Sequence, residues 1–301
     1  MTSLCVYGRR FLKAVEVKNN ETQGGKVMST LKKRLKNLQI VMGGSIVFVL
    51  VIMAIFAPLV APLDPLAIDV PGRLSPPSAY HWLGTDALGR DVFSRLIFGT
   101  RISLMIGVLA SFFGAVVGVT IGIISGYYGK WVDAVVMRFC DILLAFPGIL
   151  LALGIITILG AGTFNTIIAV SIFAVPIFAR IARGQAMQVK KAEYIDAIKT
   201  VGASDLRILT RHILPNILSP ITVQMTLYVA SAIVTAASLS FLGLGTQQPT
   251  PEWGTMLADG REFLLQAPHL VLYPGLSILI TVLGINLLGD GLRDALRPRG
   301  R

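Results

Sequence analysis

A line of polar side chains runs along one of the most apolar stretches of the chain, residues 217–244. Gln224, Tyr228, Ser231, Thr235 and Ser238 fall at i, i+4, i+7, i+11 and i+14, which places them on one face of a helix. Amide and hydroxyl groups at this spacing can hydrogen-bond to water or to a polar solute, so one interpretation is the wall of a translocation path. The alternative is hydrogen bonding between packed membrane helices.

The residue patterns of a nucleotide-binding or hydrolytic enzyme are missing. A phosphate-binding loop needs G-x-x-x-x-G-K-[ST], and both Gly-Lys pairs, Gly25-Lys26 and Gly129-Lys130, lack the hydroxyl residue and the first glycine. H-E-x-x-H and G-x-S-x-G do not occur, and no cluster of Cys or His marks a metal site. The sequence therefore predicts a non-catalytic chain with no metal and no cofactor of its own.

One polar segment, 184–215, is large enough to fold by itself. Ile195, Ile198 and Gly202 share a face of a first short helix, and Gly202 is suited to end it because helices commonly stop at a left-handed residue. Ser204 or Asp205 can cap a second helix, whose apolar positions are Leu206, Leu209 and Ile213. A hairpin this short buries little alone. We expect its apolar ridge to pack either on the underside of the membrane helices or on a separate partner.

The elements that must carry these features are membrane helices. Apolar residues make up 54% of the chain and charged residues 14%, against about a quarter in soluble domains. A span needs about 20 apolar residues, and six stretches qualify: 40–62, 102–126, 139–161, 164–182, 217–244 and 270–290. The first begins too late for a cleavable signal. The fold class is an all-α polytopic membrane protein with six spans.

The distribution of basic residues predicts that both termini are cytoplasmic. With that orientation 22 of the 27 Lys and Arg residues lie inside, and five lie outside. The net charge of +11 then needs no nucleic-acid partner, because anchoring against the inner leaflet explains it. The predicted organisation is a basic tail (1–39), a first span (40–62), an external segment (63–100) and a five-span core (101–301) that contains the cytoplasmic loop.

The external segment ends in an apolar run that Asp91 can cap. The residues 92–97 could form a short helix in the membrane interface, or they could be the first turn of the second span; the sequence leaves both open. The predicted organisation takes the interfacial helix. At the start of the third span, Arg138 and Asp141 are spaced to pair with each other at i and i+3.

Glycine recurs every fourth residue in the second span. This spacing stacks the glycines on one face and lets a neighbouring helix approach closely. We expect a packing seam rather than a binding site at Gly114, Gly118, Gly122 and Gly126.

The hairpin resembles the EAA loop of the permeases of binding-protein-dependent ABC importers. The matching stretches are residues 193–203, EYIDAIKTVGA, and 211–215, RHILP. Asp196, Ala197 and Ile198 take the places of Glu-Ala-Ala, and Gly202 that of the motif glycine. Asp for Glu, Ile for the second Ala, and His212 for an aliphatic residue depart from the pattern but keep its chemistry.

Other stretches resemble the peptide/nickel branch of that family, specifically its C-type permease. They are LGTDALGRD at 83–91, CDILLAFPG at 140–148, SLSFLGLG at 238–245, PTPEWG at 249–254 and GDGLRDAL at 289–296. The resemblance runs from about residue 40 to the end of the chain.

The resemblance implies a type I importer permease in a bacterial cytoplasmic membrane. Its partners would be a B-type permease, two ABC ATPase subunits that hold ATP and Mg, and an extracytoplasmic solute-binding protein. Dipeptides, oligopeptides or glutathione would be the cargo; nickel or another small solute is the alternative, and a secondary transporter is the competing class. Coupling to the ATPases would use Ala192, Glu193, Asp196, Ala197, Gly202, Ala203, Ser204, Asp205, Leu206 and Pro215.

Overall fold

The computed structural model describes residues 38–296, and within that range every regular element is a helix. The basic tail lies outside the described residues except for its last two positions. Five helices are long and apolar enough to cross a membrane, and a bent pair makes a sixth crossing. The five are the first helix (Leu38–Ile55), α3 (Val92–Tyr128), α6 (Thr163–Lys190), the helical stretch Asp205–Phe241, and α11 (His269–Leu296). The six-span fold class is confirmed.

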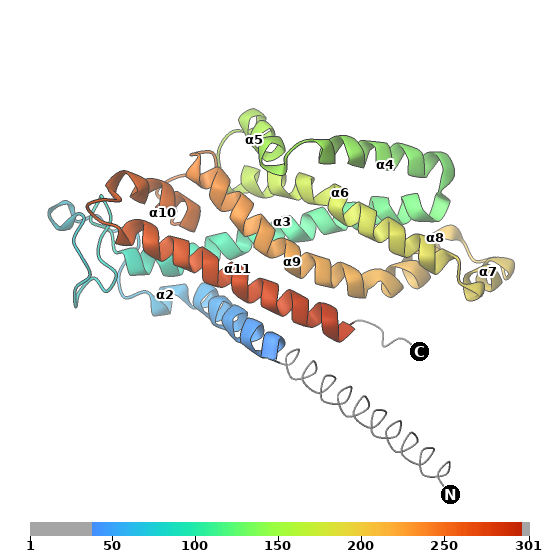
Figure 1. The fold of residues 1–301 in the computed structure, drawn as a ribbon, viewed down its shortest axis with the longest axis horizontal. Helices are drawn as coiled ribbons and strands as arrows, with labels where there is room; N and C mark the ends of the chain where they lie inside the picture. Colours follow the sequence, from blue (N-terminus) through green and yellow to red (C-terminus); the bar gives the residue numbers. More distant parts are fainter. Residues whose placement is uncertain (1–37, 297–301) are drawn as a thin grey trace, which may run out of the picture.

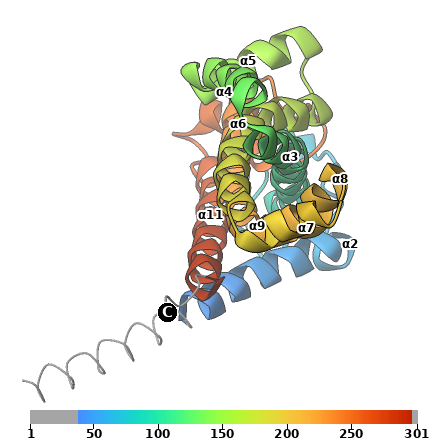
Figure 2. The same cartoon turned by 90° about the vertical axis from the view of Figure 1, so that its right-hand side faces the viewer.

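The centre of the bundle is formed by α3, α6 and α9 (Leu214–Phe241), and α9 also packs along α11. Figures 1 and 2 show the first helix on the side of this bundle opposite to α4 (Lys130–Ala145) and α5 (Gly148–Leu159). Small and branched side chains fill the centre around Phe178 of α6, which is fully buried. The bundle thereby holds α9, with its polar side chains, at a fixed position beside α5 and α11.

The four glycines of α3 form its contact with α6. A Cβ atom on Gly118 would lie 2.5 Å from the carbonyl oxygen of Val175, and one on Gly122 would lie 2.4 Å from that of Ala179. Gly114 and Gly126 meet α6 in the same way. Because the obstructing atoms are backbone atoms, they cannot rotate aside as a side chain would. The two helices therefore approach to a distance that only glycine permits.

The third crossing is not the single helix 139–161 that the sequence predicts. It begins at Lys130 as α4, stops at Phe146-Pro147, and turns by 93° into α5. Phe146 is extended, and Pro147 has no N–H with which to continue the helix, so the break falls at this pair. Pro176, in contrast, lies inside α6 without ending it.

The two acidic side chains of α4 pair with α6 and not within α4. Asp141 accepts a hydrogen bond from Arg180 at 2.6 Å, and Asp133 pairs with Arg183. The predicted pair of Arg138 with Asp141 is wrong because α6 brings a guanidinium group to Asp141 from the side. These two ion pairs tie the α4 arm to the central bundle.

At one end of the molecule, α3 begins directly at Val92 and continues to Tyr128. Asp91 caps it, accepting from the backbone N–H of Ser94 at 2.8 Å. Val92 and Leu96 are buried against α10 (Trp253–Gly260) and α11 instead of facing an interface. The separate interfacial helix is therefore wrong, and the alternative, the first turn of a long span, is what the structure has.

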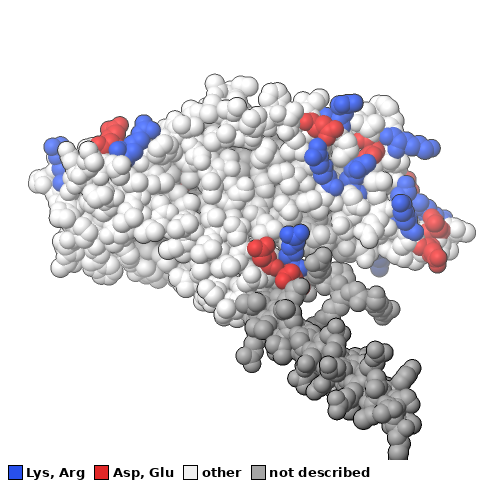
Figure 3. Space-filling view, viewed as in Figure 1, with Lys and Arg blue, Asp and Glu red and all other residues white. Residues whose placement is uncertain are grey.

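This α10 end, at the left in Figure 1, also contains the short helices α2 (Ala57–Val60), η1 (Val70–Gly72) and η3 (Arg261–Phe263). The opposite end, which we call the α7 end, contains α7 (Glu193–Thr200), α8 (Asp205–Arg207) and the π-helical turn η2 (Ile208–Ile213). Figure 3 shows the charged side chains gathered at these two ends and where α11 stops, with a broad uncharged band between the ends. That band is the part of the surface suited to hydrocarbon.

Candidate functional site

The hairpin at the α7 end has two limbs that differ in how deeply they are buried. Its first limb, α7, buries Ile195 completely and exposes Glu193, Asp196 and Ala197. Ile198 is half-buried against the same core as Ile195. The limb therefore rests on the bundle through one edge and presents the rest of its surface to the outside.

Gly202 ends the first limb in the conformation that the sequence predicts. Its φ is +86°, the backbone N–H of Gly202 donates to the carbonyl of Lys199 at 2.9 Å, and that of Ala203 donates to the carbonyl of Ile198 at 3.2 Å. These two bonds form a Schellman motif, which satisfies the last carbonyls of the helix. Space around the Gly202 Cα is open, so a side chain there would be opposed by backbone strain and not by a clash.

The second limb faces the bundle with a different residue from the one predicted. Ile208 and Ile213 are fully buried, whereas Leu206 is 70% exposed. The prediction uses α-helical spacing, but η2 is a π-helix, in which residues five apart come onto nearly the same side. Leu206 therefore belongs to the outer surface. Ser204 occupies the cap position without a side-chain hydrogen bond to the helix.

The outer surface of the hairpin has an apolar ridge beside a shallow hollow. Val201 is 89% exposed at the turn, close in sequence to the exposed Leu206. A cavity of about 390 Å³ opens beside Val201, lined by Ala197, Ile198, Val201, Gly202, Ala203, Arg207 and His212. A ridge and a hollow side by side can accept a complementary helix or loop from another chain.

Most of the predicted coupling residues lie on this accessible surface. The exposed ones are Glu193, Asp196, Ala197, Gly202, Ser204, Asp205, Leu206 and Pro215, while Ala192 and Ala203 are half-buried. Tyr194 stands behind them, with its hydroxyl accepting from Asn216 Nδ2 at 3.3 Å. Eight of the ten predicted coupling residues are therefore accessible from outside this chain.

Tyr127 at the end of α3 anchors the hairpin, and sequence reasoning missed it. Its hydroxyl donates to Asp205 Oδ1 at 2.6 Å, and its backbone carbonyl accepts from Lys190 Nζ. The ammonium groups of Lys190 and Lys199 lie 5.5 and 5.3 Å from the centre of its ring. A Tyr-Tyr-Gly sequence at a predicted helix end was the available signal, but nothing in it names residues some 60 to 80 positions away.

The chain matches two family descriptions. Residues 118–301 match "Binding-protein-dependent transport system inner membrane component", and residues 32–77 match "N-terminal TM domain of oligopeptide transport permease C". The first covers more than half of the chain, the hairpin included. The chain belongs to this family of ABC importer permeases.

Full-length relatives agree with the assignment. Over 254 residues, the permease is 53% identical to the glutathione transport system permease protein GsiD of Shigella flexneri serotype 5b (strain 8401), covering 84% of each chain. It is 51% identical, with the same coverage, to the protein of that name from Escherichia coli O6:K15:H31 (strain 536 / UPEC).

A solved structure shares the fold. The permease aligns with a chain of the MetNI methionine ABC transporter, determined in an inward-facing conformation, with a TM-score of 0.55 and 20% identity. The match covers 68% of this permease and 97% of that chain. At this identity the likeness concerns the fold, which is that of an ABC importer permease.

The polar residues of α9 do not all share one surface in the permease. Tyr228 is buried and donates from its hydroxyl to the carbonyl of Val170 in α6 at 3.0 Å, which is a bond between helices. Ser231 is exposed, and Gln224, Thr235 and Ser238 are half-buried. Thr235 and Ser238 donate to backbone carbonyls one turn earlier in α9. Hydrogen bonding between packed helices, the alternative to a translocation path, therefore describes Tyr228. The other four polar residues reach the open side of α9.

The open side of α9 continues into an apolar groove. This groove of about 320 Å³ lies between α5, α9, α10 and α11, and Ser238 is its polar member; the lining residues are Ile149, Val234, Ala237, Ser238, Phe241, Leu242, Leu257 and Ile278. It ends at Phe241 and Leu242, where α9 stops. The groove leads from the middle of the bundle toward the α10 end.

Proposed function

We propose that this permease passes peptides, glutathione among them, from an external solute-binding protein into the bacterial cytoplasm, driven by ATPase subunits that dock on the α7 end. The observation that carries the docking is the exposed ridge of Val201 and Leu206 on a turn fixed by Gly202. Apolar side chains this exposed on a rigid, charged element are typical of a protein interface. The relatives named for glutathione transport support the cargo.

The orientation follows from the charges at the α7 end. Lys190, Lys191, Lys199, Arg207 and Arg211 all lie in or beside the hairpin, and positive residues favour the cytoplasmic side. Both chain termini would then be cytoplasmic. ATP and Mg would bind the partner subunits, and the permease would transmit their movement through the hairpin.

The path for cargo would run along α9 against a second, B-type permease. Gln224, Ser231, Thr235 and Ser238 lie on the side of α9 that this chain leaves open, and the apolar groove adjoins it. A partner covering the exposed apolar residues of α9, such as Val234 and Leu218, would enclose these polar groups in a channel. Alternating access would then open this channel to either side in turn.

The experiment is Gly202→Asp in the assembled importer. At φ +86° a non-glycine residue costs about 1–2 kcal/mol, enough to displace the turn that presents the ridge. We expect normal membrane levels, loss of peptide uptake, and loss of the ATPases from the purified complex.

Gly129→Asp is the matched control, because Gly129 also has a positive φ (+66°) and open space at a turn but lies outside the hairpin. It should retain most uptake. Normal transport by Gly202→Asp would rule out coupling through this turn.

A further inference from the structure

A second cavity lies at the α10 end, beyond the end of the α9 groove. Its volume is about 470 Å³, within the range of small-ligand sites. Phe241 and Leu242 line both this cavity and the α9 groove, so the two adjoin at these side chains. A solute that enters the cavity at the α10 end therefore lies beside the α9 groove.

The wall of this cavity contains a buried arginine with an unused donor. Arg95 is 1% exposed; its Nη1 donates to the carbonyl of Pro65 at 3.3 Å and its Nε lies 3.5 Å from Asp86 Oδ2. Its Nη2 has no hydrogen-bond partner, the single buried side-chain N or O atom in that state among the described residues. Burying a guanidinium group with two unpaired N–H bonds costs free energy unless an acceptor binds to them.

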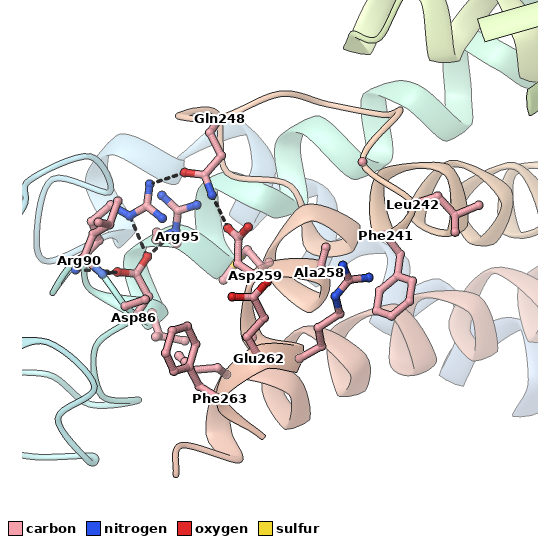
Figure 4. Close-up of a pocket in the computed structure, with 18 residues that line it drawn as sticks. Asp86, Arg90, Arg95, Phe241, Leu242, Gln248, Ala258, Asp259, Glu262 and Phe263 are labelled. Atoms are coloured by element: carbon pink, nitrogen blue, oxygen red, sulfur yellow. Dashed lines mark hydrogen bonds and ion pairs between the residues drawn. The ribbon is translucent and has the colours of Figure 1, made fainter. Parts of the chain in front are cut away.

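Two of the three acids that line the cavity, Asp86 and Asp259, are already hydrogen-bonded; the third is Glu262, which is exposed. Asp86 accepts from Arg90 Nε at 2.6 Å and from the backbone N–H groups of Leu88 and Arg90. Asp259 accepts from Gln248 Nε2, and Gln248 Oε1 accepts from Arg90 Nη1. Figure 4 shows Arg95 beside Arg90, with Asp259 across from it on the cavity wall.

The cavity is lined by three arginines (Arg90, Arg95 and Arg261) and three acids (Asp86, Asp259 and Glu262), so it can take one more anion when one of the acids is neutral. The pKa of Asp259 is raised, chiefly by burial and also by the nearby Asp86. The hydrogen bond from Gln248 and the charges of Arg95 and Arg90 act in the opposite direction but are outweighed. The neutral form of Asp259 is thereby favoured relative to an exposed aspartate. Arg261 also lines the cavity; its guanidinium lies 5.2 Å from the centre of the Phe241 ring and makes no ion pair with any residue in 38–296.

We propose that this cavity binds the carboxylate of a small solute on its way to α9, with Arg261 capturing it near Phe241 and Arg95 donating to it from the cavity wall. Guanidinium groups are suited to this task because their planar forks match carboxylate geometry. The cargo class would be solutes with a free carboxylate, such as peptides with an unblocked C-terminus. The passage of the solute from this cavity to α9 rests on the proposed function, whereas the binding experiment below does not depend on it.

A free solute fits the cavity better than an acidic side chain of a docking protein. Arg95 is too deeply buried for a protein surface to reach, whereas a small molecule can enter a volume of this size. The adjoining α9 groove also offers a solute a further site, which a docked side chain would not need.

The test uses two probes, N-acetyl-Ala-Ala and its C-terminal amide, with the purified complex that contains this chain in lipid nanodiscs. Saturation-transfer NMR measures binding without ATP or a binding protein, so a negative result leaves the proposed transport untouched. We expect binding of the carboxylate probe and at least tenfold weaker binding of the amide. Arg261→Gln should weaken the carboxylate probe by a similar factor, and Arg95→Lys should also weaken it.

Arg73→Gln is the control, since Arg73 is exposed at the same end but does not line the cavity. Equal binding of both probes, or carboxylate binding unchanged in Arg261→Gln, would overturn the proposal. So would a result in which neither probe binds while Arg261→Gln weakens docking of the binding protein, because the arginine would then serve a protein contact. If Arg95→Lys does not assemble, Arg261→Gln decides alone.

Discussion

The two ends of the permease treat charged side chains in opposite ways. At the α10 end charged side chains are buried, among them Arg95 and Glu252, each 1% exposed. At the α7 end the charges stay in solvent and apolar side chains are uncovered, with Val201 89% exposed. Buried charge fixes one geometry, because each group must keep its partners. Exposed apolar surface awaits a partner. In the proposed function, the α10 end would be a rigid entrance and the α7 end a docking surface.

Replacing Glu252 is the strongest test of this difference between the two ends. Its carboxylate caps α10 by accepting from the N–H groups of Gly254 and Thr255 at 2.9 and 3.0 Å, and it also accepts from the Ser103 hydroxyl at 3.1 Å. Glu252→Ala leaves these buried donors without an acceptor, which should destabilise the α10 end by about 3 kcal/mol. Thermal denaturation of the purified permease complex should show a clear loss of stability.

Glu262→Ala is the companion variant, since Glu262 is exposed ten residues further along and makes no hydrogen bond or ion pair in the described part of the chain. It should change stability by no more than about 0.5 kcal/mol. Equal effects of the two variants would mean that burial of charge does not stiffen the α10 end.

Tyr127 gives a smaller and sharper test at the other end. Tyr127→Phe removes the 2.6 Å hydrogen bond to Asp205 but keeps the ring beneath Lys190 and Lys199. Since Asp205 is exposed and can take water instead, the loss should be about 1 kcal/mol. Hydrogen exchange at residues 204–208 should become several-fold faster, while overall thermal stability changes little.

Tyr80→Phe, at an exposed tyrosine of the α10 end, should leave exchange in the hairpin unchanged. If Tyr127→Phe also left it unchanged, the hairpin would be held by its apolar contacts alone, and Tyr127 would not be an anchor.

The sequence predicts those features that depend on local spacing. Six apolar stretches, the glycine seam and the stop at Gly202 follow from periodicity and from the conformational range of glycine, and the structure contains all three. Features that depend on a neighbouring helix were not predictable in the same way. Asp141 pairs with Arg180, and Tyr228 turns to α6, because of how α4, α6 and α9 meet in space.

Two further differences come from backbone geometry that hydrophobic patterns do not record. Because residues 208–213 form a π-helical turn, Ile208 is buried where the sequence predicts Leu206. The right-angle break between α4 and α5 gives no sign in the sequence beyond Phe146-Pro147. The arginine cavity was also missed, because its members come from segments about 160 residues apart.

The docking role of the α7 end can be tested most directly by photocrosslinking in intact membranes. A photoreactive amino acid replaces Val201 in one variant and Leu265, 98% exposed at the α10 end, in the other. We predict a crosslink from position 201 to an ATPase subunit and none from position 265. An active importer in which position 201 fails to crosslink to the ATPase, or in which position 265 crosslinks equally well, would contradict the account.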